Sequence, residues 1–149
     1  MGFSEKRPSI IFNLNADIAF VQLQDHSASG DIDFCVAGEN LAQFETCYLK
    51  NDGKLWKAQG DAYATTEGTL AMALEAISAD DTGAFILCGW VRDDTWTWTV
   101  GGRIYVSPST AGVITQTVPA SGEQIRKVGF AYSAAIIWFG PSDNIIELV

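Results

Sequence analysis

Hydrophobic and polar positions alternate in short runs along this chain, and the most apolar run covers residues 84–92. Almost every side chain in this run is apolar, which is typical of a strand that is buried on both faces. We therefore expect this strand at the centre of the core, with Leu87 among its fully buried side chains.

The preceding run, residues 69–78, fits two periodicities. Its apolar residues recur at a helical spacing, while alternate residues from Leu70 onward also fit the two-residue period of a strand. Its Ala, Leu, Met and Glu residues favour a helix by propensity. Residues 80–83 form a turn signal, however, and so short a turn between two apolar runs suits a hairpin. We predict a strand, with a helix as the alternative.

Residues 31–36 alternate cleanly between polar and apolar positions. A strand places successive side chains on opposite faces. We therefore expect Ile32, Phe34 and Val36 to point into the core, and Asp31 and Asp33 to point outward.

The strongest hairpin signal is the pair Asp52-Gly53, because it readily supplies the positive φ that a tight turn needs. The turn joins a predicted strand over residues 42–50, with Phe44 and Tyr48 on one face, to a return strand over residues 55–58. Further short strands are predicted at residues 9–14, 17–23, 95–99, 103–106, 113–115, 123–132, 135–139 and 144–149.

Turn signals arrive about every ten residues, and no long helix is compelling. The sequence therefore predicts an all-β fold, a single-domain antiparallel β-sandwich or small β-barrel. Residues 1–40 are expected to form N-terminal strands or an arm that contacts another subunit or a capsid, and residues 41–149 the β domain.

Composition limits the classes of function. With 149 residues and 48% hydrophobic content, the chain can bury a core without disulfides or metals. A formal net charge of -9 argues against a nucleic-acid partner, which needs clustered Lys and Arg. No apolar run approaches the ~20 residues of a membrane span, and the N-terminus lacks the apolar core of a signal peptide. We expect a soluble protein that does not bind membranes.

Candidate catalytic and metal-binding residues are few. His26 lies in a polar loop, where an exposed histidine is more common than a catalytic one. The triplet that begins at Asp81 matches the core of aspartic proteases, but a hairpin turn explains it with less effort. Cys35, Cys47 and Cys88 are dispersed within predicted strands, as small hydrophobic residues in a reducing cytosol would be. We therefore expect no enzymatic activity, no cofactor and no metal.

The aromatic content is unusual, since the chain has five tryptophans. Trp96 and Trp98 are predicted to share one face of a short strand. Two indoles side by side can fill a core or a subunit interface, or they can stack on sugar rings. We favour the core or the interface.

From residue 44 onward, the order of short motifs resembles virion structural proteins of tailed bacteriophages. The matching segments are YLKNDGKLWKA (48–58), LAMAL (70–74), FILCGWV (85–91), GGRIYVS (101–107), GVITQT (112–117), VGFA (128–131) and IWFGPS (137–142). The resemblance is to small capsid decoration, or cement, proteins and to the β-rich modules of head and tail fibres. It implies a β-tulip-like fold and a non-enzymatic homotrimer. Such a protein is made in the host cytoplasm and bound to the major capsid protein or other proteins of the virion.

On this interpretation, the N-terminal segment attaches the subunit to its neighbour or to the shell by adding a strand. The aromatic region between residues 96 and 105 would then contact other subunits. The expected interface residues are Ile10, Ile11, Phe12, Trp96, Trp98 and Tyr105. The alternative is a receptor-binding or carbohydrate-binding module that holds a surface glycan on Trp96 and Trp98.

Overall fold

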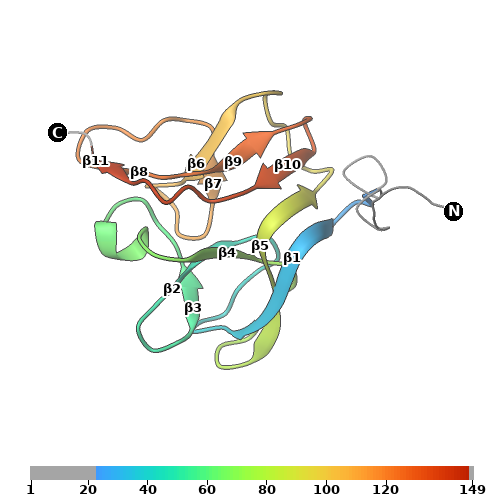
Figure 1. The fold of residues 1–149 in the computed structure, drawn as a ribbon, viewed down its shortest axis with the longest axis vertical. Coiled ribbons are helices and arrows are strands. Elements are labelled where there is room, and N and C mark those ends of the chain that lie inside the picture. The colour runs from blue at the N-terminus through green and yellow to red at the C-terminus, as the bar shows by residue number, and fades with distance from the viewer. Residues whose placement is uncertain (1–22, 148–149) are drawn as a thin grey trace, which may run out of the picture.

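The structure is a computed structural model that describes residues 23–147, and its fold is all-β (Figure 1). The one helix in this part of the chain is the short 3-10 turn η2 (Tyr63–Thr65). The strands are β1 (Ser27–Val36), β2 (Thr46–Leu49), β3 (Leu55–Lys57), β4 (Leu70–Ala73), β5 (Thr82–Arg92), β6 (Arg103–Val106), β7 (Ile114–Thr115), β8 (Gln124–Ile125), β9 (Lys127–Ala131), β10 (Ile136–Phe139) and β11 (Ile146–Glu147).

All but two of these strands form one nine-stranded sheet in the order β3-β2-β4-β5-β10-β9-β6-β7, with β1 paired to β5. The remaining strands, β8 and β11, pair with each other. Every pair of strands is antiparallel, and the large sheet curls into a half-barrel (Figure 1). The prediction of a single-domain, antiparallel all-β fold is confirmed.

The longest strand, β5, holds the two halves of the sheet together. One edge of its 11 residues pairs with β1 from Thr82 to Arg92, except at Leu87. The other edge pairs first with β4, at Phe85 and Ile86, and then with β10, from Gly89 to Arg92. Since β5 belongs to both halves, the predicted central strand is indeed the centre of the fold.

Two hydrophobic clusters lie on opposite faces of β5. Ile86 belongs to the first hydrophobic cluster and Phe85 to the second, and both side chains are fully buried. Leu87 is only half-buried, so the expectation that it is fully buried was wrong. The reason is a register shift, since Asp31 pairs with Cys88 and Ile32 pairs with Ile86, which leaves Leu87 without a partner on β1.

Residues 70–73 form the strand β4, as predicted, although their composition favours a helix. All of them are buried, and Met72 and Ala73 pair with Ile86 and Phe85 on β5. Burial between two strands outweighs a propensity difference of less than about 1 kcal/mol per residue. Gly53 has a φ of 82°, which confirms the tight turn between β2 and β3.

Two segments that were predicted as single strands have a different conformation in the structure. Residues 95–99 form no strand, because Asp93 accepts hydrogen bonds from the amide and hydroxyl of Thr95 and so fixes a turn. Residues 123–132 are divided into β8 and β9 by Arg126. The side chain of Arg126 is 3% exposed, and it donates to the carbonyl oxygens of Thr66 and Ser142 at 2.6 Å and 2.8 Å.

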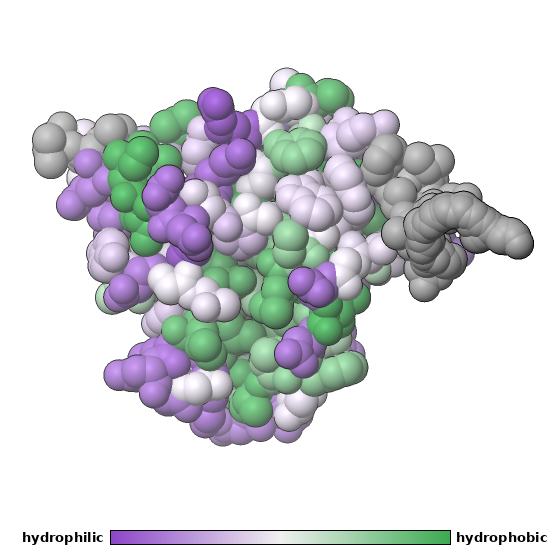
Figure 2. Space-filling model, in the orientation of Figure 1, coloured by the Kyte–Doolittle hydropathy of each residue, from purple (hydrophilic) through white to green (hydrophobic). Residues whose placement is uncertain are grey.

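The apolar face of β1 is also different from the prediction. Ile32 is 44% exposed and Phe34 is 69% exposed, so neither side chain is buried in the core. Both lie on the same face as the buried Ile86, but β1 is at the edge of the sheet, beyond the residues that cover β5. Figure 2 shows hydrophobic residues at the surface over the part of the molecule where β1, β2 and β4 lie.

The predicted strands at residues 9–14 and 17–23, apart from Leu23, lie outside the described residues. So do three of the expected interface residues, Ile10, Ile11 and Phe12. Part of the expected N-terminal arm, Ser27–Val36, lies in the sheet as β1.

Candidate functional site

A groove of about 400 Å³ lies between three loops and is lined by aromatic and acidic side chains. We call it the aromatic groove and define it by Phe44, Glu45, Asp93, Trp96 and Trp98. These five residues come from the loop before β2 and from the loop after β5, and the segment from Gly112 to Ile114 forms the third side of the groove. The described part of the chain therefore brings together two segments that are far apart in sequence.

The rings of the groove form a connected series. The centroids of Phe44 and Trp96 are 5.5 Å apart at an interplanar angle of 48°, and those of Trp96 and Trp98 are 5.6 Å apart at 58°. Both indoles are half-buried and pack against the first hydrophobic cluster. The prediction that Trp96 and Trp98 lie side by side therefore holds, but the rings are tilted and present no single flat surface.

The Trp98 side chain carries an unusual polar group. Its Nε1 atom is buried and has no hydrogen-bond partner among the described residues. A buried donor without a partner costs about 1–3 kcal/mol, so most such groups in proteins are satisfied. Because this N–H is buried, a ligand oxygen in the groove could satisfy it only if the surrounding side chains moved.

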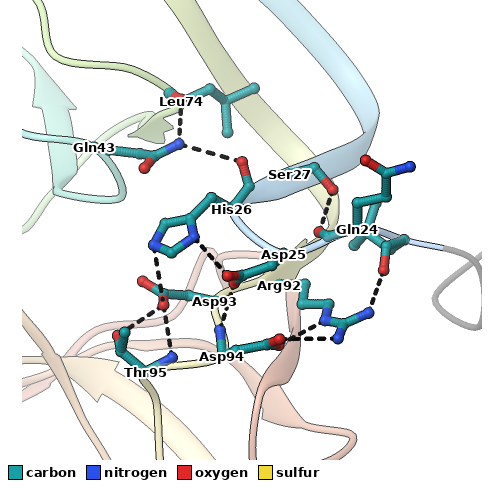
Figure 3. Close-up of polar contacts among 11 residues, drawn as sticks. Gln24, Asp25, His26, Ser27, Gln43, Leu74, Arg92, Asp93, Asp94 and Thr95 are labelled. Carbon is teal, nitrogen blue, oxygen red and sulfur yellow. Dashed lines mark hydrogen bonds and ion pairs between the residues drawn. The ribbon is translucent and has the colours of Figure 1, made fainter.

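The position of Phe44 depends on its backbone. Its φ is 68°, and its amide donates to the carbonyl of Ala73 at 2.7 Å. The side-chain Nε2 of the neighbouring Gln43 donates to the carbonyls of His26 and Leu74 at 3.3 Å and 3.0 Å (Figure 3). These bonds connect the loop before β2 to the start of β1 and to the end of β4.

His26 lies beside the groove, between two carboxylates (Figure 3). Its Nδ1 is 3.0 Å from Asp25 Oδ2 and its Nε2 is 3.5 Å from Asp93 Oδ1. The amide of Asp94 donates to the Asp25 carboxylate, and this bond holds the pKa of Asp25 below its usual value. The predicted loop histidine is exposed, but the fold gives it partners on both nitrogens.

The same three side chains could also be considered as metal ligands. One ligand atom each of Asp25, His26 and Asp93 lies within 4.8 Å of the others. However, each carboxylate faces a different nitrogen of the imidazole, and a single ion can take only one of these nitrogens. The arrangement therefore fits a clamp between the start of β1 and the loop after β5 better than a metal centre.

Arg92 strengthens the same clamp. Its Nε and Nη2 donate to the carboxylate of Asp94 at 2.7 Å and 3.0 Å, and its Nη1 donates to the carbonyl of Leu23 at 2.6 Å (Figure 3). A bidentate guanidinium fixes orientation as well as position. Residues 23–26 are thus attached to the end of β5 by side chains as well as by the ladder of β1.

A second aromatic group lies on the outer face of the sheet. We call it the outer aromatic face and define it by Trp90, Phe130, Tyr132 and Trp138. Trp138 on β10 is opposite both Trp90 on β5 and Phe130 on β9. The Trp90 ring makes edge contacts with the other three rings at centroid distances of 5.0 to 6.1 Å.

The sequence does not predict this face, because Trp90 lies in the most apolar run, whose pattern indicates burial on both faces. Phe130 is 36% exposed and Tyr132 is 45% exposed, while Trp90 and Trp138 are half-buried. The alternation of Phe130 and Tyr132 around the buried Ala131 was the available signal, since side chains two apart share a face.

Tyr105 does not join either aromatic group. It is 9% exposed on β6, opposite Thr115 and Lys127, and it lines a separate depression with Arg103 and Gln116. Little of its side chain is accessible to another subunit, and its role at an interface stays a prediction.

The cysteines are free thiols, and two of them have a raised pKa. Burial raises the pKa of Cys47 well above its usual value, with a further contribution from the Glu45 carboxylate. Burial also raises the pKa of Cys35, assisted by the charge of Asp33. A raised pKa lowers the fraction of thiolate, which is the nucleophilic form.

Comparison with known proteins adds no relative. No protein-family model matches this chain, and no curated protein sequence matches it. Within residues 23–147, no helix has the length and apolar character that crossing a membrane requires.

Proposed function

We propose that this protein is a non-enzymatic virion structural protein of a bacteriophage, a capsid decoration protein that binds the outside of the shell and stabilises it. The observation that carries this proposal is the outer aromatic face. Its rings are held by three neighbouring strands of a sheet, and Phe130 and Tyr132 are partly exposed there. Rigid aromatic side chains of this kind are enriched at the centres of protein interfaces.

The state of the polar groups supports a structural role. The carboxylate of Asp93 accepts from Thr95 and faces His26, whose other nitrogen faces Asp25. These contacts hold the residues before β1 against the loop after β5, which is a structural role. The formal net charge of -9 keeps free subunits dispersed before they bind.

Decoration would stabilise a shell by mass action. A protein that binds the assembled shell but not its dissociated subunits shifts the equilibrium toward the shell, and attachment at many lattice sites strengthens the effect. We further propose that the subunits bind as homotrimers in contact with the major capsid protein.

Electron microscopy of empty capsids mixed with the purified protein tests this function. The protein should add density to the outer surface at regular positions. The variant Phe130→Ser should bind less, while Val118→Ser, which changes a side chain 55% exposed elsewhere on the molecule, should bind as the natural protein does. Equal loss of binding in both variants would contradict a role for the outer aromatic face.

A second candidate function is carbohydrate binding in the aromatic groove. It is favoured by the series of rings from Phe44 to Trp98 and by the buried, unpartnered Nε1 of Trp98. A glycan array tests it, with Trp96→Ala as the variant that should lose binding. Specific binding that Trp96→Ala abolishes would support this candidate, and absence of binding to any glycan would remove it.

A further inference from the structure

The strand β1 has a free edge within the described residues. Its 10 residues pair with β5 along one side. On the other side, within residues 23–147, pairing begins only after β1 has ended, where Ala37 bridges Leu55 of β3. Figure 1 shows β1 beside β5, with the C-terminal end of β1 running toward β3. The edge of a sheet presents backbone N–H and C=O groups that can pair with another strand.

The two faces of β1 have different chemistry at this edge. Ile32 and Phe34 lie on the face of the first hydrophobic cluster but are 44% and 69% exposed. Asp31 and Asp33 alternate with them on the other face, and both are exposed. This is the pattern of a half-buried strand whose apolar side chains lack a cover within residues 23–147.

We propose that β1 is a docking edge for an extended protein segment in which apolar and basic residues alternate. Such a segment would add a strand to the sheet, with its apolar side chains beside Ile32 and Phe34. Its Lys or Arg side chains would then lie beside Asp31 and Asp33, since neighbouring side chains on one face of a sheet interact across the strands.

The hydrogen bond of the Phe34 amide fits this mode of binding. The amide donates to the Asp33 carboxylate at 2.8 Å. A carbonyl of an added strand can take over this N–H, because a carbonyl oxygen also accepts from a backbone amide. The Asp33 carboxylate is then released and can pair with a basic side chain of the partner.

A second copy of β1 is a poor occupant of this edge. Antiparallel pairing of two copies would bring Asp31 and Asp33 near the same acidic residues, and like charges across a sheet are destabilising. The register shift beside Asp31 also distorts the edge against pairing with an identical strand. The aspartates thus disfavour a second copy of β1 and favour a segment with basic side chains. This inference does not rest on the proposed function.

The test uses the full chain and a defined probe, an acetylated and amidated peptide in which valine and lysine alternate over the length of β1. Titration should give saturable binding, and the amides of β1 should become protected from hydrogen exchange. Asp33→Asn and Phe34→Thr should each weaken binding roughly threefold, since cross-strand pairs contribute about 0.2–1 kcal/mol. Val118→Thr is the matched control, because it changes an exposed apolar residue outside β1.

Control peptides separate strand addition from attraction to an acidic protein. A peptide of the same composition, with its valines and lysines in two blocks, should bind weakly, and so should the alternating peptide with N-methylated valines. Asp33→Lys should shift the preference toward a peptide that alternates valine and glutamate. Equal binding of the alternating and block peptides would overturn the proposal. Absence of binding, or self-association that Phe34→Thr abolishes, would also overturn it.

Discussion

Gly30 and Gly89 face each other across β1 and β5, and neither position has room for a side chain. A Cβ atom at Gly30 would lie 2.7 Å from the Cα of Gly89, and one at Gly89 would lie 2.8 Å from the Cα of Gly30. Both residues have a φ of 152°, which side chains rarely allow. The close approach is located where β5 leaves β4 and begins to pair with β10.

The replacement Gly89→Ala should therefore lower the free energy of unfolding by about 3 kcal/mol, because the backbone of β1 must move. Gly53→Ala is the control, since Gly53 also has a positive φ but open space around it, and it should cost about 1 kcal/mol. Urea unfolding measures both. Similar losses for the two variants would contradict the close packing of β1 on β5.

The uneven burial of side chains along β5 makes a second prediction about stability. Phe85→Ala should cost about 3–5 kcal/mol, because its side chain is fully buried. Leu87→Ala should cost less than about 2 kcal/mol, because Leu87 is half-buried and its loss leaves a smaller cavity. The comparison uses the same urea unfolding measurement. If Leu87→Ala lost more stability than Phe85→Ala, the centre of the core would lie at Leu87 and not at Phe85.

The positions of the strands and turns along the chain were predictable in part, because apolar runs and turn signals depend on local sequence. The hairpin at Gly53 and the strand after residue 84 required only local sequence. The exposure of Phe34 could not be predicted, since alternation shows which residues share a face but not whether that face is covered. That depends on the position of β1 at the edge, which is set by the register along β5.

The candidate sites were predictable to a smaller extent. The proximity of Trp96 and Trp98 followed from their spacing, although a turn at Asp93 rather than a strand brings it about. The contact of Phe44 with Trp96 joins two loops, and no local pattern contains that information. Trp138 opposite Trp90 is likewise a consequence of register between β10 and β5.

Buried Arg126 makes a third prediction. Arg126→Met should lower the free energy of unfolding by about 3 kcal/mol, because the carbonyls of Thr66 and Ser142 lose their charged donor. Lys127→Met changes the exposed neighbour and should alter stability by less than about 0.5 kcal/mol. Differential scanning calorimetry checks the pair. A thermal midpoint unchanged in Arg126→Met would show that these hydrogen bonds are dispensable.

Acid should weaken the clamp at Asp25. Its pKa is lowered in the folded protein, chiefly by the amide of Asp94, so its contribution to stability is complete above the unfolded value near 3.8. That contribution is lost as the pH falls below 3.8 and through the lower folded pKa. Asp25→Asn should remove this part of the dependence. The free energy of unfolding of both proteins, measured from neutral pH to pH values below 3.8, checks this prediction. Parallel curves of this free energy against pH for the two proteins would contradict it.

The thiols should differ in reactivity. Burial and a raised pKa should leave Cys47 unmodified by iodoacetamide in the folded protein near neutral pH. Cys35 and Cys88 are partly exposed and should react before Cys47. Mass spectrometry of the alkylated peptides measures this order, and full reaction of all three cysteines in denaturant is the control. Early modification of Cys47 in the folded protein would contradict its burial.

The proposed stabilisation of a shell is tested most directly by the disruption temperature of matched phage particles with and without this protein. We predict a higher disruption temperature for the decorated particles. Particles carrying Phe130→Ser should fall between the two, and those carrying Val118→Ser should match the natural protein. Equal disruption temperatures with and without the protein would contradict the account.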